Sequence, residues 1–203
     1  MKLFFSPASP YACKVMAVAS ELGLASLIEL QASSASPVKC NMTIAEHNPS
    51  GMVPTLLTET DGAIFDSHVI CDYLGARVPG NHVVPAAGPT RWQAMREEAI
   101  ADSLLDAALL ARYEMSLRPP DLRWPEWREG QMAKVRRALA RIEQLAPAFD
   151  GRADLGTLAI ACALGYLDAR FPDLQWRQDH PQAGVWYDGF GQRPSLTYAS
   201  WST

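Results

Sequence analysis

The 203-residue sequence lacks the features of a secreted, membrane-spanning or nucleic-acid-binding protein. Its four cysteines are far apart and form no C-x-x-C pair, so we expect neither a disulfide framework nor a metal site. No apolar run reaches the roughly 18 residues that a membrane-spanning helix needs. A net charge of −4 offers no basic surface for nucleic acid or for an anionic membrane. The apolar run at 3–5 stops at Ser6, so we expect no signal peptide and a cytoplasmic location.

The hydrophobic pattern changes near residue 80 and predicts two domains. Before that point, short strand patterns alternate with helical ones in the order βαβαββα, which is typical of a small α/β domain over residues 1–78. We expect strands at 3–5, 27–30, 55–58 and 63–65, and helices at 10–22, 38–46 and 67–77. Residues 79–89 contain three prolines and two glycines, a composition that predicts a linker.

Every pattern after the linker is helical, which predicts an all-α domain over residues 90–203. Thr90 is expected to cap the first of these helices, and Pro119 to follow its end. The next helix has apolar residues at spacings of three and four: Met132, Val135, Leu139, Ile142, Ala146 and Phe149. Residues 155–167 are apolar nearly all round, so we expect a helix buried at the domain centre. A last helix is expected around 180–192.

A serine and a proline stand between the first strand and the first helix, in the segment Ser9-Pro10-Tyr11-Ala12. Serine is a strong helix N-cap, and proline is favoured at the first helical position. The Ser9 hydroxyl is therefore expected beside unpaired backbone N–H groups, where a thiolate, a carboxylate or a phosphate can bind. An ordinary capped helix without a ligand explains the same pair equally well.

A second proline stands just before the third expected strand. Residues 48–56 read N-P-S-G-M-V-P-T-L. Proline cannot donate to a sheet ladder, so Pro54 belongs at the first position of that strand. A cis Val53–Pro54 bond would turn the Val53 backbone outward to pair with an extended peptide, although trans is the ordinary state of such a bond.

An acidic residue and a serine precede the helix at 67–77. Ser67 can cap that helix, whose N-terminus can receive a carboxylate. The charge of Asp66 suits an ammonium group, so the pair could bind an α-amino acid head group. A helix cap with no ligand is again the alternative.

Four segments, in this order, resemble cytosolic glutathione S-transferases of the serine-using bacterial type over essentially the whole chain. Ser9-Pro10-Tyr11-Ala12 resembles the C-P-Y-C or C-P-Y-A turn of thioredoxin-like domains, with serine at the first cysteine position. Residues 48–56 resemble N-P-x-G-K-V-P-x-L, whose proline is cis in the family. Residues 65–74, F-D-S-H-V-I-C-D-Y-L, resemble the motif [DE]-S-x-x-I-x-x-Y-L, which binds the γ-glutamyl group in the family. Residues 192–195 resemble the R-P-S segment that closes the family's helical domain.

The resemblance implies a thioredoxin-like domain, an all-α domain, a homodimer, and glutathione as co-substrate without a metal. Ser9 would be the catalytic residue, donating its hydroxyl proton to the glutathione sulfur. Val53, next to Pro54, would pair with the cysteinyl backbone of the tripeptide. Asp66 and Ser67 would hold the γ-glutamyl amine and carboxylate.

The chain departs from the family pattern at two places. Met52 replaces a lysine that contacts the glycine carboxylate of glutathione, and Lys39 is the nearest substitute, unless it is only a solvated surface lysine. The family's Ser/Thr-x-x-Asp capping box also appears incomplete, because Thr157 is followed three residues later by Ile160.

The second substrate is expected between the domains. Candidate residues for this site are Ala8, Tyr11, Asp102, Asp106 and Tyr113. Asp102 and Asp106 lie one turn apart, and their negative charges repel one another, which suggests a functional use for the pair. One of them could contact the glutathione amine across a dimer interface. The alternative is that both lie on a solvated helix face. Tyr166 could reach the same cleft or belong to the core.

These residues predict a glutathione transferase that promotes attack of the thiolate on a small electrophile. A glutathione-dependent isomerase or lyase with the same fold is an alternative. Met52 favours a third reading, a non-catalytic binding protein that has lost affinity for glutathione. Serine at position 9 argues against a thiol oxidoreductase.

Overall fold

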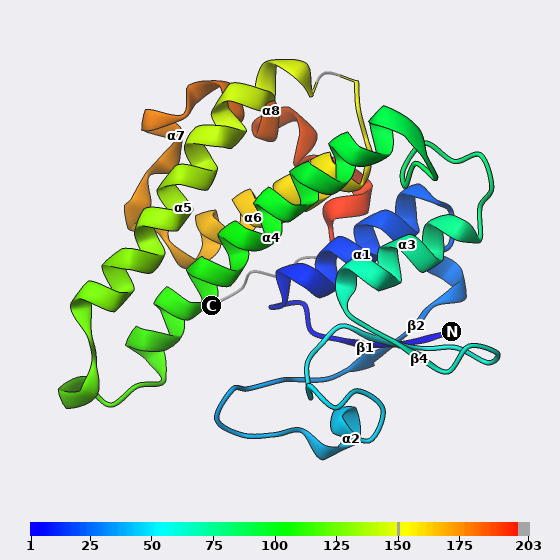
Figure 1. The fold of residues 1–203 in the computed structure, drawn as a ribbon, viewed down its shortest axis with the longest axis horizontal. Helices are drawn as coiled ribbons and strands as arrows, with labels where there is room; N and C mark the ends of the chain where they lie inside the picture. Colours follow the sequence, from blue (N-terminus) through cyan, green and yellow to red (C-terminus); the bar gives the residue numbers. More distant parts are fainter. Residues whose placement is uncertain (150, 199–203) are drawn as a thin grey trace.

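The computed structural model describes residues 1–149 and 151–198, so the expected helical domain at 90–203 extends beyond the described part. Four strands form one mixed sheet in the order β2-β1-β3-β4 (Figure 1). They are β1 (Lys2–Phe5), β2 (Glu29–Ala32), β3 (Thr55–Leu57) and β4 (Ala63–Ile64). β2 runs parallel to β1, while β3 is antiparallel to both β1 and β4. The expected thioredoxin-like topology is confirmed.

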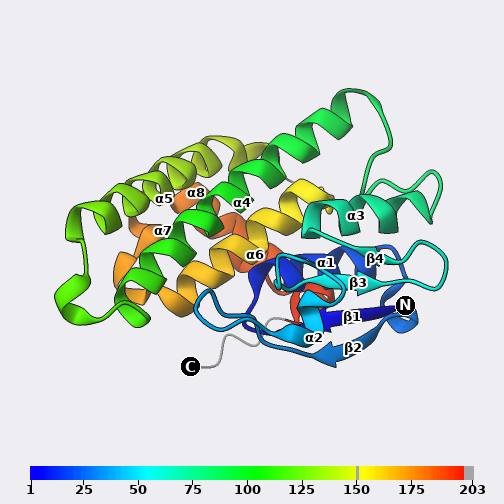
Figure 2. The ribbon, with the colours of Figure 1, turned by 60° about the horizontal axis from the view of Figure 1, so that its bottom comes forward.

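Three helices belong to this sheet: α1 (Pro10–Glu21), α2 (Met42–Ala45) and α3 (Ser67–Ala76). α1 and α3 cover the face of the sheet that is turned toward the helical domain, and α2 lies on the opposite side (Figures 1 and 2). β2 begins two residues later than expected because a 3-10 turn occupies Ala25–Leu27. α2 is shorter than the helical pattern at 38–46.

The rest of the described chain is helical. Its α-helices are α4 (Gly88–Ser116), α5 (Pro125–Leu145), α6 (Leu155–Arg170), α7 (Trp176–Asp179) and α8 (Pro181–Phe190). α4 begins at Gly88 with Ala87 in the N-cap position, so the expectation that Thr90 caps this helix is wrong. No helix in the described part is both long enough and apolar enough to cross a membrane.

α6 is the central helix, as its apolar composition predicts, and every residue from Leu155 to Leu167 is buried. Asp154 caps it by accepting a hydrogen bond from the Thr157 N–H, and the Thr157 hydroxyl accepts one from the Asp154 N–H. The capping box is therefore complete, with the acid at the N-cap position and the hydroxyl at the third helical position, N3. The expectation of a missing acid was wrong because it placed Thr157 at the cap position.

Each domain has its own core, and α1 and α6 join them (Figure 2). The first core includes the apolar face of α1 together with Leu158 and Cys162 of α6. The second core lies among α4, α5 and α6, and Tyr11 packs against its edge. The residues just before and at the start of α1 consequently lie where the two domains meet.

Candidate active site

Ser9 occupies the N-cap of α1. Its backbone is extended (φ −92°, ψ 114°), and its Oγ accepts a hydrogen bond from the Ala12 N–H at 3.3 Å. Pro10 fills the first helical position, as the sequence predicts. Among the described residues nothing accepts the hydroxyl proton of Ser9, so that proton is available to a ligand at the positive end of the helix.

The Val53–Pro54 bond is cis, as the resemblance implies. Asn48 holds this loop from within, because its side-chain amide donates to the Met52 carbonyl at 3.3 Å and to the Thr55 hydroxyl at 2.8 Å. Neither the N–H nor the C=O of Val53 bonds to any part of the chain that the structure describes. Both groups are free to pair with an extended ligand.

Asp66, and not Ser67, caps α3. Its carboxylate accepts hydrogen bonds from the N–H groups of His68 (3.1 Å) and Val69 (3.5 Å). Ser67 is the first helical residue and is only 4% exposed. The expected cap at Ser67 was therefore wrong by one residue, yet both polar side chains lie at the helix N-terminus.

The sheet brings these three turns to one edge. In the β1–β3 pairing, Phe4 lies opposite Thr55, so Pro54 is next to the end of β1 that leads to Ser9. In the β3–β4 pairing, Leu56 lies opposite Ile64, so the end of β4 that leads to Asp66 comes to the same edge. A donor hydroxyl, a free peptide group and a capped helix N-terminus therefore converge on one region.

A buried ionic cluster lies behind this edge, among α1, α3 and α4. The Lys14 Nζ is 2.8 Å from the Glu98 Oε1 and 2.8 Å from the Asp102 Oδ2. The other Glu98 oxygen is 2.6 Å from the His68 Nδ1, which joins the cluster to the start of α3. Burial alone would lower the pKa of Lys14, but the charges of Asp102 and Glu98 raise it above its ordinary value.

This cluster was missed by the sequence reasoning. Lys14 stands in an otherwise apolar helix, and that interruption was the available signal. Asp102, expected at the second-substrate site, pairs with Lys14, and burial raises its pKa while Lys14 opposes that rise.

Of the remaining candidates for the second substrate, the structure brings Tyr11 and Asp106 together. The Tyr11 hydroxyl donates to the Asp106 carboxylate across the domain boundary, and burial followed by this hydrogen bond raises the pKa of Tyr11. Ala8 is exposed in the turn before α1, and Tyr113 lies farther along α4 near Tyr166. The start of α1 and the middle of α4 are therefore joined across the domain boundary.

The three comparisons agree on the family. Models of the glutathione S-transferase N-terminal and C-terminal domains match residues 8–77 and 125–189. The chain is 31% identical over 186 residues, covering 89% of each protein, to the uncharacterized GST-like protein YibF of Escherichia coli K12. The chain belongs to the glutathione S-transferase family.

Solved members of the family carry glutathione or a derivative. A glutathione transferase family member from Pseudomonas fluorescens Pf-5, crystallised with bound glutathione, is 44% identical with a TM-score of 0.93 and 96% coverage of both chains. A second structure from Pseudomonas fluorescens Pf-5 contains S-(propanoic acid)-glutathione, with 44% identity, a TM-score of 0.88 and 97% and 96% coverage.

At two positions of this family member the contact with glutathione stays a prediction. Met52 is 57% exposed, and Lys39 is exposed in the loop before α2. No described residue forms a hydrogen bond or ion pair with the Lys39 side chain, so its role toward glutathione stays a prediction. Within the described ranges, no three His, Cys, Asp or Glu side chains gather closely enough to hold a metal ion.

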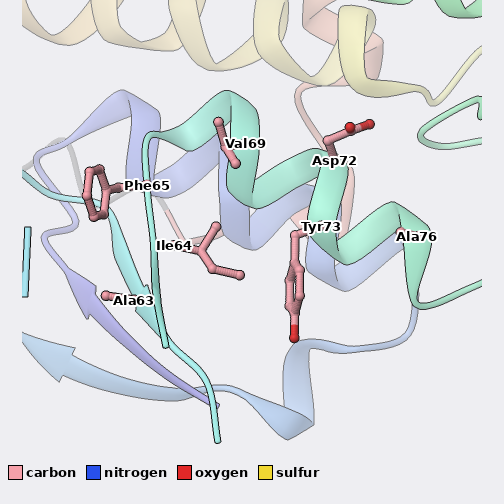
Figure 3. Close-up of a pocket in the computed structure, with 7 residues that line it drawn as sticks. All are labelled: Ala63, Ile64, Phe65, Val69, Asp72, Tyr73 and Ala76. Carbon is pink, nitrogen blue, oxygen red and sulfur yellow. The ribbon is translucent and has the colours of Figure 1, made fainter. Parts of the chain in front are cut away.

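A groove of about 430 Å³ lies on the other side of α3, facing β4 (Figure 3). Its lining is mostly apolar: Ala63, Ile64, Phe65, Val69, Asp72, Tyr73 and Ala76. It contains none of the residues assigned to glutathione, although Phe65 directly precedes Asp66. This groove and the candidate chemistry are therefore at different places.

Proposed function

We propose that this family member is a glutathione transferase in which the Ser9 hydroxyl donates a hydrogen bond to the thiolate of bound glutathione. The observation that carries the proposal is the state of the Ser9 side chain. Its oxygen already caps α1, while its proton has no acceptor among the described residues. Ser9 therefore needs to transfer no proton and acts only as a hydrogen-bond donor.

The energies of this arrangement are sufficient to ionise the thiol. A free thiol has a pKa of about 8.5, and each unit of depression requires about 1.4 kcal/mol. A hydrogen bond to a charged group contributes about 1.5–3 kcal/mol, and a helix N-terminus adds about 0.3–1 kcal/mol. Together they lower the thiol pKa by about one to three units, which leaves much of the glutathione as thiolate at neutral pH.

The rest of the tripeptide would follow the same edge of the sheet. The free N–H and C=O of Val53 would pair with the cysteinyl residue. Asp66 and Ser67 would hold the γ-glutamyl amine and carboxylate at the start of α3. Lys39 would be the cation nearest in sequence to the glycine carboxylate, since Met52 offers none.

In the proposed reaction the glutathione sulfur attacks an electrophilic carbon of a small second substrate. A C–S bond forms, the bond to the leaving group breaks with its electron pair, and the thiol proton goes to solvent. S-(propanoic acid)-glutathione, seen with the Pseudomonas protein, has a short substituent on sulfur and suits an electrophile of that size. An isomerase or lyase would use the same thiolate and differ in the later fate of the C–S bond.

The test is glutathione binding by calorimetry, with the thiolate absorbance followed against pH, for the wild type, Ser9→Ala and Ser6→Ala. Ser6 is the matched control because its hydroxyl accepts from the Ala8 N–H in the same turn. We expect Ser9→Ala to raise the thiol pKa by about one unit or more and Ser6→Ala to leave it unchanged. Equal thiol pKa values in all three proteins would reduce Ser9 to a helix cap.

Met52 supports a second candidate function, a binding protein with weak affinity for glutathione. Its exposed side chain supplies no charge to the glycine carboxylate. Absence of binding at millimolar glutathione would favour this candidate over the transferase. Restoration of binding by Met52→Lys would then identify the missing lysine as the cause.

A homodimer and a cytoplasmic location remain predictions of the resemblance. The groove between α3 and β4 is the surface we propose for contact between two copies. Val69 beside it is 46% exposed, and Trp92 follows Arg91, which pairs with Asp72 of the groove. Sedimentation velocity of Val69→Glu against the wild type would test this contact.

A further inference from the structure

Two arginines lie close to the buried side chain of Tyr166, where α4 packs against α6. Arg112 lies on α4, while Tyr166 and Arg170 are one turn apart on α6. Burial raises the pKa of Tyr166 to about 12, and the positive charges of Arg112 and Arg170 oppose that rise. Two cations therefore lie close to one point between α4 and α6.

Neither of these arginines is neutralised by a carboxylate in the part of the chain that the structure describes. The arginines that do form ion pairs there are Arg91, Arg118, Arg136, Arg152, Arg177 and Arg193. The Nε of Arg170 is moreover buried without a hydrogen-bond partner. A buried guanidinium donor that no described group satisfies is costly, and an anionic ligand would satisfy it.

This point lies near the residues expected to bind the second substrate. Tyr11, two residues after Ser9, lies close enough to Tyr166 for the two phenols to influence one another electrostatically. The nearby carboxylates are already engaged, since Asp106 accepts from Tyr11 and Asp102 pairs with Lys14. The unpaired charge of this region is consequently positive.

We propose that Arg112 and Arg170, beside Tyr166, bind a carboxylate carried by the electrophile, so that the enzyme selects acidic second substrates. The inference rests on the proposed transferase function and specifies its substrate class. The planar fork of arginine suits a carboxylate, which it can hold with two parallel hydrogen bonds. The bonds made and broken remain those of the thiolate attack, because the carboxylate is bound and does not react.

The test compares S-(carboxyalkyl)glutathiones having one to four methylene groups with the corresponding carboxamides, by calorimetry. Each pair has nearly the same shape and differs in charge, so the ratio of the two dissociation constants isolates the contribution of the carboxylate. We expect at least one acid to bind the wild type about tenfold more tightly than its amide. Arg112→Leu and Arg170→Leu should each reduce that ratio severalfold and leave the affinity for glutathione itself unchanged.

Arg137→Leu is the matched control, because Arg137 is exposed on α5 in the same domain and should not alter the ratio. Arg112→Lys and Arg170→Gln replace any leucine variant that fails a thermal-unfolding check, and both should also lower the ratio. If no acid binds better than its amide while glutathione binds normally, the substrate class is wrong and the proposed function survives. If glutathione itself does not bind, the proposed function fails first.

Discussion

The proposed glutathione site and the proposed site of the second substrate differ in how their side chains are held. At the proposed glutathione site, Ser9 and Asp66 bond to backbone N–H groups two or three residues away. At the proposed site of the second substrate, Tyr11 bonds to Asp106, which is 95 residues distant. The first site is thus made by local caps, whereas the second exists only when the two domains are packed together.

Lys14 connects the local helix caps with the long-range contacts. It lies on α1, which carries Ser9 at its start, and it bonds to α4 residues 84 and 88 positions away. Glu98 then extends the cluster to His68 at the start of α3. Local caps therefore hold Ser9 and Asp66 at the starts of their helices, and a long-range cluster joins those helices to one another.

Removal of Lys14 is expected to have the largest effect. Lys14→Met leaves the buried Glu98 without its cation, and breaking such a pair costs about 3–5 kcal/mol. For a chain of this length the melting temperature should fall by about 10 °C, measured by calorimetry or circular dichroism. Lys134→Met, which changes an exposed lysine on α5, should leave the melting temperature nearly unchanged.

The double variant Lys14→Met with Glu98→Gln separates two causes of this loss of stability: the uncompensated charge of Glu98 and the lost packing around the lysine stem. If the uncompensated charge is responsible, neutralising Glu98 should recover a large part of the loss. An equal loss in the single and double variants would point to packing around the lysine stem instead.

The same distinction explains what the sequence could predict. Ser-Pro before a helix, proline before a strand and an all-apolar helix are local patterns, and each predicted its element or cap to within about two residues. The pairing of Asp102 with Lys14 depends on how α1 packs against α4, which no spacing along the chain reveals. Asp102 and Asp106 have the same local context, yet one enters the buried cluster and the other binds Tyr11.

The cap of α6 is a local feature and should be less costly to remove. Asp154→Ala deletes the acceptor for the Thr157 N–H, with an expected loss of about 1 kcal/mol, or a few degrees in melting temperature. Asp154 also pairs with Arg152, so Asp154→Asn is needed to separate the two contributions. Because asparagine can still cap the helix, Asp154→Asn should lower the melting temperature less than Asp154→Ala does. Equal decreases for the two variants would assign the effect to the ion pair with Arg152.

The long-range contact of Glu21 is partly exposed and should contribute less to the stability of the fold than the cap at Asp154. Arg193 donates to Glu21 at 2.9 Å and 3.0 Å, and the Ser195 hydroxyl donates at 2.6 Å. The hydrogen bond from Arg193 is the main reason that the pKa of Glu21 lies below its ordinary value. Solvent around the half-exposed arginine limits the contribution to less than about 1 kcal/mol.

This contribution has a defined pH dependence. Because the pKa of Glu21 is lowered in the folded protein, its stabilisation is present above the unfolded value of about 4.3 and is lost as the pH falls through the folded value. Unfolding of Glu21→Gln and the wild type should therefore differ at pH 7 and converge below about pH 4. Glu59→Gln, at an exposed turn, should match the wild type at both pH values, and a constant gap for Glu21→Gln would contradict the assignment.

The smallest effect is expected from Tyr11→Phe, and it tests whether the two proposed sites act separately. Loss of one hydrogen bond to the exposed Asp106 should change stability by less than about 1 kcal/mol. The KM for the electrophile should rise about threefold, while the affinity for glutathione stays the same, because Tyr11 faces α4 and not the edge of the sheet. Tyr73→Phe makes the same chemical change in a Tyr–Asp pair on the far side of α3, where Tyr73 bonds to Asp61 at 3.0 Å. Steady-state kinetics of both variants decide the point: a rise in the glutathione KM for Tyr11→Phe would show that the proposed site of the second substrate also shapes the glutathione site.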